Sequence, residues 1–152
     1  MDSVWSFEFS VDCPVSPDSA WHYWTNVKNW ALDLDVESVA LNGPFEPGAR
    51  GVTISKSSGT IEWRIAEVQP GRAVLEFPAP GALATFIWTF VDSADGTKIT
   101  QRADLSGPDA ARYIDLARAL EVGIPAGMQK LCEAMQESIR GEDRSSGART
   151  EP

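Results

Sequence analysis

The chain has 152 residues, 43% of them hydrophobic and 23% charged, and a formal net charge of −9. This length predicts one domain, and the composition is typical of a globular protein. The acidic balance, without clustered lysine and arginine or a basic amphipathic segment, excludes a nucleic-acid role and attachment to an anionic membrane.

The N-terminal part predicts one strand followed by two short helices. Residues 5–11, WSFEFSV, alternate apolar and polar side chains, which is the period of a half-buried strand. Ser16 and Pro17 supply an N-cap and a first helical residue. We therefore predict one short helix over residues 17–25 and another around residues 27–32, with Trp21 and Trp24 on one side of the first.

From about Val36 the chain predicts six further strands. Alternating segments such as RGVTIS, TIEWRIAEV and ALATFIWTFV are separated by short turn sequences such as KSSG, QPGR and DSADG. Turns this short join antiparallel strands. With the first strand, the chain should form a seven-stranded antiparallel sheet.

After residue 109 the apolar period changes to that of a long helix. One stripe of this helix should be buried; it comprises Tyr113, Leu116, Ala117, Leu120, Ile124, Met128, Leu131, Met135 and Ile139. Pro125 should kink or divide the helix. The order of elements predicts an α+β fold, with residues 1–140 as a single domain and residues 141–152 as a disordered polar tail.

Location and redox state are predicted from the N-terminus and the cysteines. MDSVWSFEFSVD lacks a basic start, and the longest apolar run is shorter than the about 20 residues that span a membrane. We predict a cytoplasmic location without membrane insertion. Cys13 and Cys132 form no CxxC motif, so we expect two reduced thiols. Two cysteines and one histidine predict no metal site, and we expect no cofactor.

No catalytic motif is evident in the sequence. A Ser–His–Asp or Cys–His mechanism would need His22, the only histidine, and no nucleophile motif accompanies it. We interpret His22 as a residue of the helix surface. No glycine-rich phosphate loop occurs either.

The predicted strands place aromatic residues and one amide on a common face. Phe86, Trp88 and Phe90 share a face of their strand, and Gln101 shares the corresponding face of the next with Ile99. Such a face is typical of a pocket for an apolar ligand with an orienting polar group. The rings could equally fill a core under the helix, and both interpretations stay open. Trp63 should point inward with its neighbouring isoleucines.

The chain resembles the SRPBCC, or START-like, superfamily, and within it the polyketide cyclase/dehydrase and lipid-transport branch. The resemblance rests on SPDSAW, TNVKNW, GPFEPGARG, AEVQPGRAVLEF, DGTKITQRADLSGP and GIPAGMQKL, in this order over residues 5–140. It implies the helix-grip fold, in which a curved seven-stranded sheet surrounds a long C-terminal helix and encloses a cavity. The branch often has a histidine where this chain has Gln101. Because Gln cannot shuttle protons, the departure weakens an acid–base role.

The resemblance leaves several classes of function. We prefer a carrier or sensor that binds a small hydrophobic molecule, and the alternative is a cyclase/dehydrase-type enzyme acting on such a ligand. A protein-interaction domain is a third interpretation, and a homodimer is left open. The expected ligand-binding residues are Trp24, Trp30, Trp63, Phe77, Phe86, Trp88, Gln101, Tyr113 and Leu120. For the enzyme, the candidate catalytic residues are Gln101, Arg102 and Tyr113.

Overall fold

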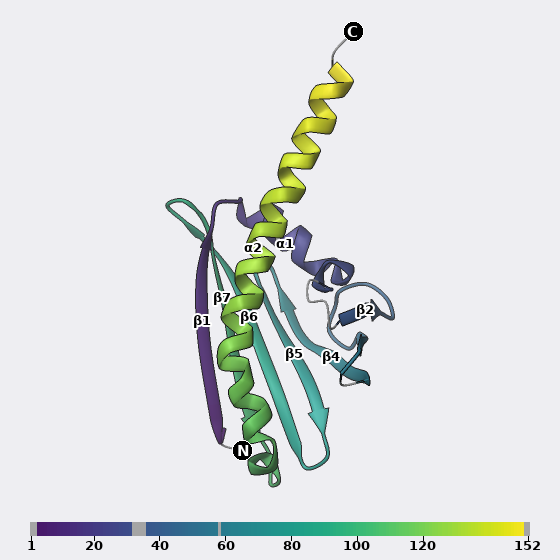
Figure 1. Ribbon diagram of the computed structural model, residues 1–152, viewed down its shortest axis with the longest axis vertical. Helices are drawn as coiled ribbons and strands as arrows, with labels where there is room; N and C mark the ends of the chain where they lie inside the picture. Colours follow the sequence, from purple (N-terminus) through teal and green to yellow (C-terminus); the bar gives the residue numbers. More distant parts are fainter. Residues whose placement is uncertain (1–2, 32–35, 58, 151–152) are drawn as a thin grey trace.

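The computed structural model describes residues 3–31, 36–57 and 59–150, with side chains up to residue 141 (Figure 1). The end of the second predicted helix at Leu32 lies outside these ranges. The elements, in chain order, are β1 (Trp5–Cys13), α1 (Pro17–Thr25), the 3₁₀ turn η1 (Val27–Trp30), β2 (Val36–Leu41), β3 (Arg50–Ser55), β4 (Gly59–Gln69), β5 (Arg72–Ala79), β6 (Ala82–Ser93), β7 (Gly96–Ser106), the 3₁₀ turn η2 (Ala110–Tyr113) and α2 (Ile114–Thr150).

The sheet has the predicted seven antiparallel strands. Their order is β1-β7-β6-β5-β4-β3-β2, so the N-terminal strand joins the C-terminal strand at one side of the sheet. The long hairpins β4–β5, β5–β6 and β6–β7 form its centre. The α+β helix-grip architecture is confirmed.

Helix α1 begins as the sequence predicts. The Ser16 hydroxyl accepts a hydrogen bond from the Ser19 amide at 3.2 Å, and Pro17 occupies the first turn. This cap satisfies an amide that has no partner within the helix. The inner side of the helix carries Ala20 and Trp24, which are buried in the core.

Helix α2 runs along the face of the sheet beside β1, and β4 and β5 lie to one side of it (Figure 1). It continues through Pro125 without dividing. Most of the predicted stripe is buried or half-buried, but Leu116 is 71% exposed. Because the helix rests mainly on β1, the flank carrying Leu116 has no strand against it. We call the sheet face under α2 the inner face.

The last turns of α2 differ from the predicted tail. The helical backbone reaches Thr150, through a segment expected to be disordered from Gly141, and extends past the sheet in Figure 1. Once a helix is nucleated, each further residue adds a hydrogen bond without the cost of a new nucleus. Residues 151–152 of the predicted tail lie outside the described ranges. The division of the chain at residue 140 stays a prediction.

A disulfide joins the end of β1 to the middle of α2. Cys13 and Cys132 are bonded, with their Cα atoms 5.7 Å apart, and both are buried. The prediction of two reduced thiols is therefore wrong. The two residues are 119 positions apart, so only the packing of α2 on β1 brings them together. Next to this link, the buried Thr97 hydroxyl donates a hydrogen bond to the Val15 carbonyl at 2.7 Å.

Candidate functional site

The register of the central strands brings several predicted site residues onto the inner face. Trp88 on β6 is opposite Gln101 on β7, and Phe86 is opposite Leu75 on β5. Side chains of directly paired residues point to the same side of a sheet. The predicted common face is therefore confirmed. Trp63 of β4 is 2% exposed and points inward, as expected.

Six aromatic side chains, from α1, η1 and three strands, form a continuous series that we call the ring cluster. Its members are Trp24, Trp30, Trp63, Phe77, Phe86 and Trp88. Successive ring centroids are 5.0 Å apart for Trp88–Trp24, 5.2 Å for Trp24–Trp30, 5.0 Å for Trp30–Trp63, 6.0 Å for Trp63–Phe77 and 5.1 Å for Phe77–Phe86. These distances are typical of offset-stacked and edge-to-face aromatic pairs.

The ring cluster is only partly closed to solvent. Trp24 and Trp63 are each 2% exposed, and the other four members are half-buried. The Trp30 and Trp63 indole N–H groups are held internally, donating to the Trp24 carbonyl at 2.6 Å and the Thr53 hydroxyl at 3.1 Å. The buried tryptophans thus support the other rings from below, and the half-buried rings offer apolar surface that a ligand can cover.

A glycine opposite Trp63 makes this arrangement of rings compatible with the backbone. Gly51 of β3 pairs with Trp63, and a Cβ atom at Gly51 would collide with the indole ring. The Trp63 side chain therefore lies flat across the β3 backbone, which any larger residue at position 51 would prevent.

In α2, Gly123 and Gly127 have open space where a side chain would be, on the part of the helix that follows Leu120.

Gln101 is the polar residue within this apolar surface. Its residue exposure is 9%, and its amide makes no hydrogen bond with any residue that the structure describes. Among the described residues, Ser93 Oγ is the one fully buried side-chain oxygen or nitrogen without a partner, so the Gln101 amide is not completely enclosed. The amide sits beside Trp88 and, on the other strand, Phe9. A donor and an acceptor are thus available within the aromatic surface.

The remaining predicted ligand residues are Leu120 of α2 and Tyr113, the last residue of η2. Leu120 is half-buried and packs against the main core. Tyr113 belongs to a separate small cluster with Leu105, Ala110 and Ala117, and its hydroxyl donates to the Pro80 carbonyl at 2.9 Å. Since its hydroxyl already has a partner, Tyr113 is not free to serve as a proton donor.

Arg102 lies on the opposite face of β7 from Gln101. Its guanidinium pairs with Asp104 at 3.1 Å and is about half exposed, and the hydrogen bond to Asp104 raises the pKa of Arg102. Burial alone would raise the pKa of Asp104, but hydrogen bonds from Arg102, Ser6 and Ser3 and the Arg102 charge outweigh burial and lower it. The structure thus separates the three candidate catalytic residues.

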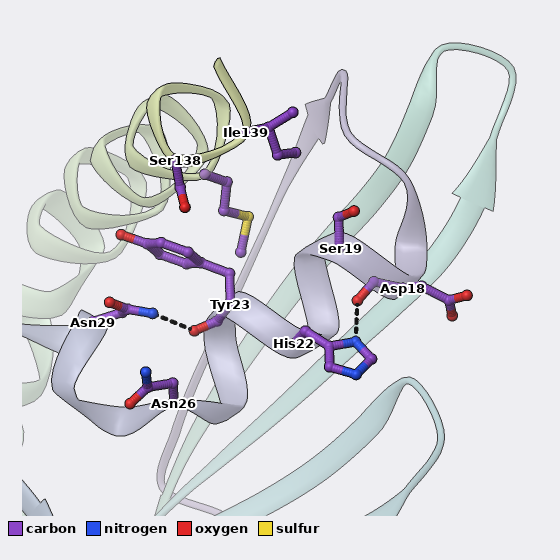
Figure 2. Close-up of a pocket in the computed structure, with 9 residues that line it drawn as sticks. Asp18, Ser19, His22, Tyr23, Asn26, Asn29, Ser138 and Ile139 are labelled. Carbon is purple, nitrogen blue, oxygen red and sulfur yellow. Dashed lines mark hydrogen bonds between the residues drawn. The ribbon is translucent and has the colours of Figure 1, made fainter. Parts of the chain in front are cut away.

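A cleft of about 480 Å³, shown in Figure 2, is lined by none of the six rings of the ring cluster. It is bounded by the outer side of α1, by η1 and by the C-terminal half of α2. From α1 it is lined by Asp18, Ser19, His22, Tyr23 and the following Asn26; Asn29 of η1 and Met135, Ser138 and Ile139 of α2 complete it. We call it the α1–α2 cleft.

The sequence did not predict this cleft. Its α1 residues fall at positions 19, 22, 23 and 26, the spacing of one helix face, so their common orientation was visible in the sequence. What the sequence could not show is that α2 passes over this face. His22, interpreted as a helix-surface residue, is indeed exposed and lines the cleft.

Several hydrogen bonds fix the cleft side chains. A carbonyl can only accept, so the 2.8 Å contact between His22 Nδ1 and the Asp18 carbonyl places the proton on Nδ1 and leaves Nε2 as an acceptor in the neutral ring. Asn29 Nδ2 donates to the Tyr23 carbonyl at 2.8 Å. Burial raises the pKa of Tyr23, so its hydroxyl stays protonated at neutral pH.

Within the described ranges, no three His, Cys, Asp or Glu residues are grouped as metal ligands. No helix in these ranges is long and apolar enough to cross a membrane. No acid or base within the ring cluster is oriented by a second polar group. The arrangement can bind and orient an apolar molecule.

The fold and the partly open aromatic surface define a helix-grip protein of the START-like class. The chain matches the family described as polyketide cyclase / dehydrase and lipid transport over residues 4–136. It therefore belongs to that family. No curated protein matches the chain in sequence.

Solved structures share the fold at low sequence identity. Protein NE0264 from Nitrosomonas europaea is 13% identical with a TM-score of 0.72, and the match covers 92% of this chain and 99% of that one. The di-domain ARO/CYC StfQ of the steffimycin biosynthetic pathway is 15% identical, with a TM-score of 0.70 over 90% of this chain and 51% of its own. Norcoclaurine synthase from Thalictrum flavum is 10% identical, with a TM-score of 0.68 over 88% of this chain and 87% of its own.

Proposed function

We propose that the protein binds a small hydrophobic molecule, with aromatic, acyl or polyketide-like character, between the inner face and α2 and acts as its carrier or sensor. The observation that carries this proposal is the ring cluster, in which four half-buried rings rest on two fully buried tryptophans. Covering apolar surface contributes about 25 cal/mol per Å² before the costs of association. A planar ligand stacked against Phe86 and Trp88 would gain most from this surface.

The comparisons support a ligand of this chemistry. The family description names polyketide cyclase, dehydrase and lipid transport, and lipids are apolar molecules. The norcoclaurine synthase structure is described as a complex with dopamine and hydroxybenzaldehyde, two small aromatic molecules. These relationships support the class of ligand for this chain.

The second candidate function is a cyclase/dehydrase-type enzyme acting on such a ligand. The unpaired Gln101 amide favours it, because it could hold a carbonyl oxygen of a flexible substrate in a reactive position. The carrier is preferred because Arg102 faces away and the Tyr113 hydroxyl is bonded to Pro80.

Titration with N-phenyl-1-naphthylamine, a neutral aromatic dye that fluoresces in apolar surroundings, tests the binding proposal. We expect saturable binding near one dye per chain, and Trp88→Ala should weaken it by about tenfold, or ~1.4 kcal/mol. Val91→Ala is the matched control, because Val91 lies on the same strand, faces outward and is 56% exposed. Unsaturable binding, or equal affinity in all three proteins, contradicts the proposal.

Mass spectrometry of the purified protein distinguishes carrier from enzyme. Under native conditions, a carrier should retain an unchanged molecule that co-purifies with it. For an enzyme, a bound substrate should be converted on incubation, and Gln101→Leu should lower kcat with little change in KM. Conversion that persists in Gln101→Leu would remove the reason for assigning chemistry to this amide.

The disulfide bears on the predicted cytoplasmic location, which stays a prediction. Stable disulfides are typical of oxidising compartments and rare in reducing ones. Cys13 and Cys132 can therefore report on location. Because both cysteines are buried, cells should be quenched in acid and the chain alkylated after denaturation. Mass spectrometry should then find both thiols modified if the protein resides in a reducing cytoplasm.

A further inference from the structure

The α1–α2 cleft has the dimensions and side chains of a binding site distinct from the ring cluster. Its volume of about 480 Å³ falls within the usual range of small-molecule sites. The inner side of α1 carries Trp24 toward the ring cluster, whereas Ser19 and Tyr23 of the outer side line the cleft. A ligand here would not displace one bound to the inner face.

Some hydrogen-bonding side chains of the cleft, such as His22 and Asn29, are held by backbone carbonyls, and others have no partner among the described residues. The Tyr23 and Ser138 hydroxyls form no hydrogen bond with any residue in the described part of the chain. In Figure 2, Tyr23 extends from α1 beneath α2, and Ser138 points toward it. Side chains that are held in place before binding lose little entropy when a ligand arrives.

The two asparagines near Tyr23 are oriented by the backbone. The Asn29 amide nitrogen donates to the Tyr23 carbonyl, which leaves the Asn29 side-chain oxygen as an acceptor. The Asn26 side-chain oxygen accepts from the Lys28 amide at 3.4 Å, which leaves the Asn26 amide nitrogen as a donor. The cleft therefore offers both a donor and an acceptor, and hydroxyl groups, which both donate and accept, can pair with either.

The charge and the apolar residues of the lining limit the chemical class of ligand further. No lysine or arginine is among the residues that line the cleft in the described structure, and Asp18 is its one formal charge at neutral His22. Phosphates and carboxylates would therefore be repelled rather than paired. The Tyr23 ring and Ile139 offer apolar surface on which the C–H groups of a polyol can rest.

We propose that the α1–α2 cleft binds a neutral polyhydroxylated molecule, such as a sugar or a sugar-like group. The Tyr23 ring supplies the surface against which it stacks. Asn26, Asn29, Ser138 and the Nε2 atom of His22 form hydrogen bonds to its hydroxyls. The inference goes beyond the proposed binding of a hydrophobic molecule and does not depend on it.

The test is an NMR titration of the full ¹⁵N-labelled chain with D-glucose, D-galactose and myo-inositol. We expect dissociation constants of order 1–10 mM, which correspond to a binding free energy of ~3–4 kcal/mol. Each polyol is therefore added to about 50 mM. At least one of the three should shift the amide signals of residues 18–29 and 135–139 in a saturable way. Inorganic phosphate and choline are the charged comparison probes and should not saturate there. No saturable shift with any of the three polyols, or saturation with phosphate or choline alone, overturns the proposal.

Variants locate the binding. Tyr23→Leu should weaken it by at least about tenfold and Ser138→Ala by about threefold, as expected for the loss of a stacked ring and of one hydrogen bond. Val122→Ala is the control, because Val122 lies on α2 outside the cleft, is 77% exposed and should leave the affinity unchanged. If Tyr23→Leu does not fold, Ser138→Ala decides the matter, and unchanged affinity in that variant overturns the assignment.

Discussion

The two sides of the inner face are built in different ways. On the side of β1 and β7, Ile99, Ala103 and Leu105 are at most 5% exposed, α2 packs along β1, and a disulfide fixes the contact. On the side of β4 to β6, Ile65 and Leu75 are also buried, but the rings of Phe77, Phe86 and Trp88 are half-buried. Helix α2 does not lie over β4 and β5 (Figure 1). One side thus anchors the long helix, and the other leaves half-buried rings that a ligand can cover.

The largest effect should come from breaking the anchored side. Double substitution Cys13→Ala/Cys132→Ala should lower the free energy of unfolding by about 4.5 kcal/mol, because the disulfide closes a long loop in the unfolded chain. Urea denaturation with and without reductant measures the effect. Reductant should destabilise the wild type and leave the double variant unchanged. Equal midpoints for the wild type with and without reductant would show that the link does not stabilise the fold.

The next effect separates the buried rings from the half-buried ones. Trp24→Ala should cost about 4 kcal/mol, because it empties a fully buried site at the centre of the aromatic residues. Its ring neighbours are Trp21, Trp30, Phe45, Trp88 and Phe90. Trp88→Ala should cost clearly less stability while weakening dye binding. If the two variants lose equal stability, Trp88 is a core residue and its side of the inner face is not open to a ligand.

Sequence patterns predicted the sheet and the faces of its strands because strand alternation and turn residues depend only on neighbouring positions in the chain. Alternation placed Phe86 and Gln101 inward, and the cap at Ser16 fixed the start of α1. The disulfide and the α1–α2 cleft could not be predicted in this way. Both depend on where α2 crosses β1 and α1, and that crossing is set by packing between segments about 120 residues apart.

The third effect concerns the polar group within the open side. Gln101→Met keeps a similar volume and removes an amide that has no protein partner among the described residues but is not fully enclosed, so stability should rise by less than about 1 kcal/mol. The same change should weaken a ligand that carries a carbonyl or hydroxyl group more than it weakens N-phenyl-1-naphthylamine. Thermal unfolding and dye titration measure the two quantities. A loss of stability would mean that the amide has a structural partner, such as an ordered water.

The smallest effect lies on the outer face of β7, behind the anchored side. The pKa of Asp104 is lower when folded than when unfolded, so its carboxylate stabilises the fold above the unfolded value near pH 4 and this contribution is lost as pH falls through the folded pKa. Asp104→Asn should therefore lower the unfolding midpoint at pH 7, and the difference from wild type should shrink below about pH 4. Glu137→Gln is the control, because Glu137 pairs with Arg140 at the surface of α2 and both side chains are more than half exposed. A difference between Asp104→Asn and wild type that persists unchanged into acid would mean that the asparagine disturbs the packing near Ser3 and Ser6 rather than removing a charge.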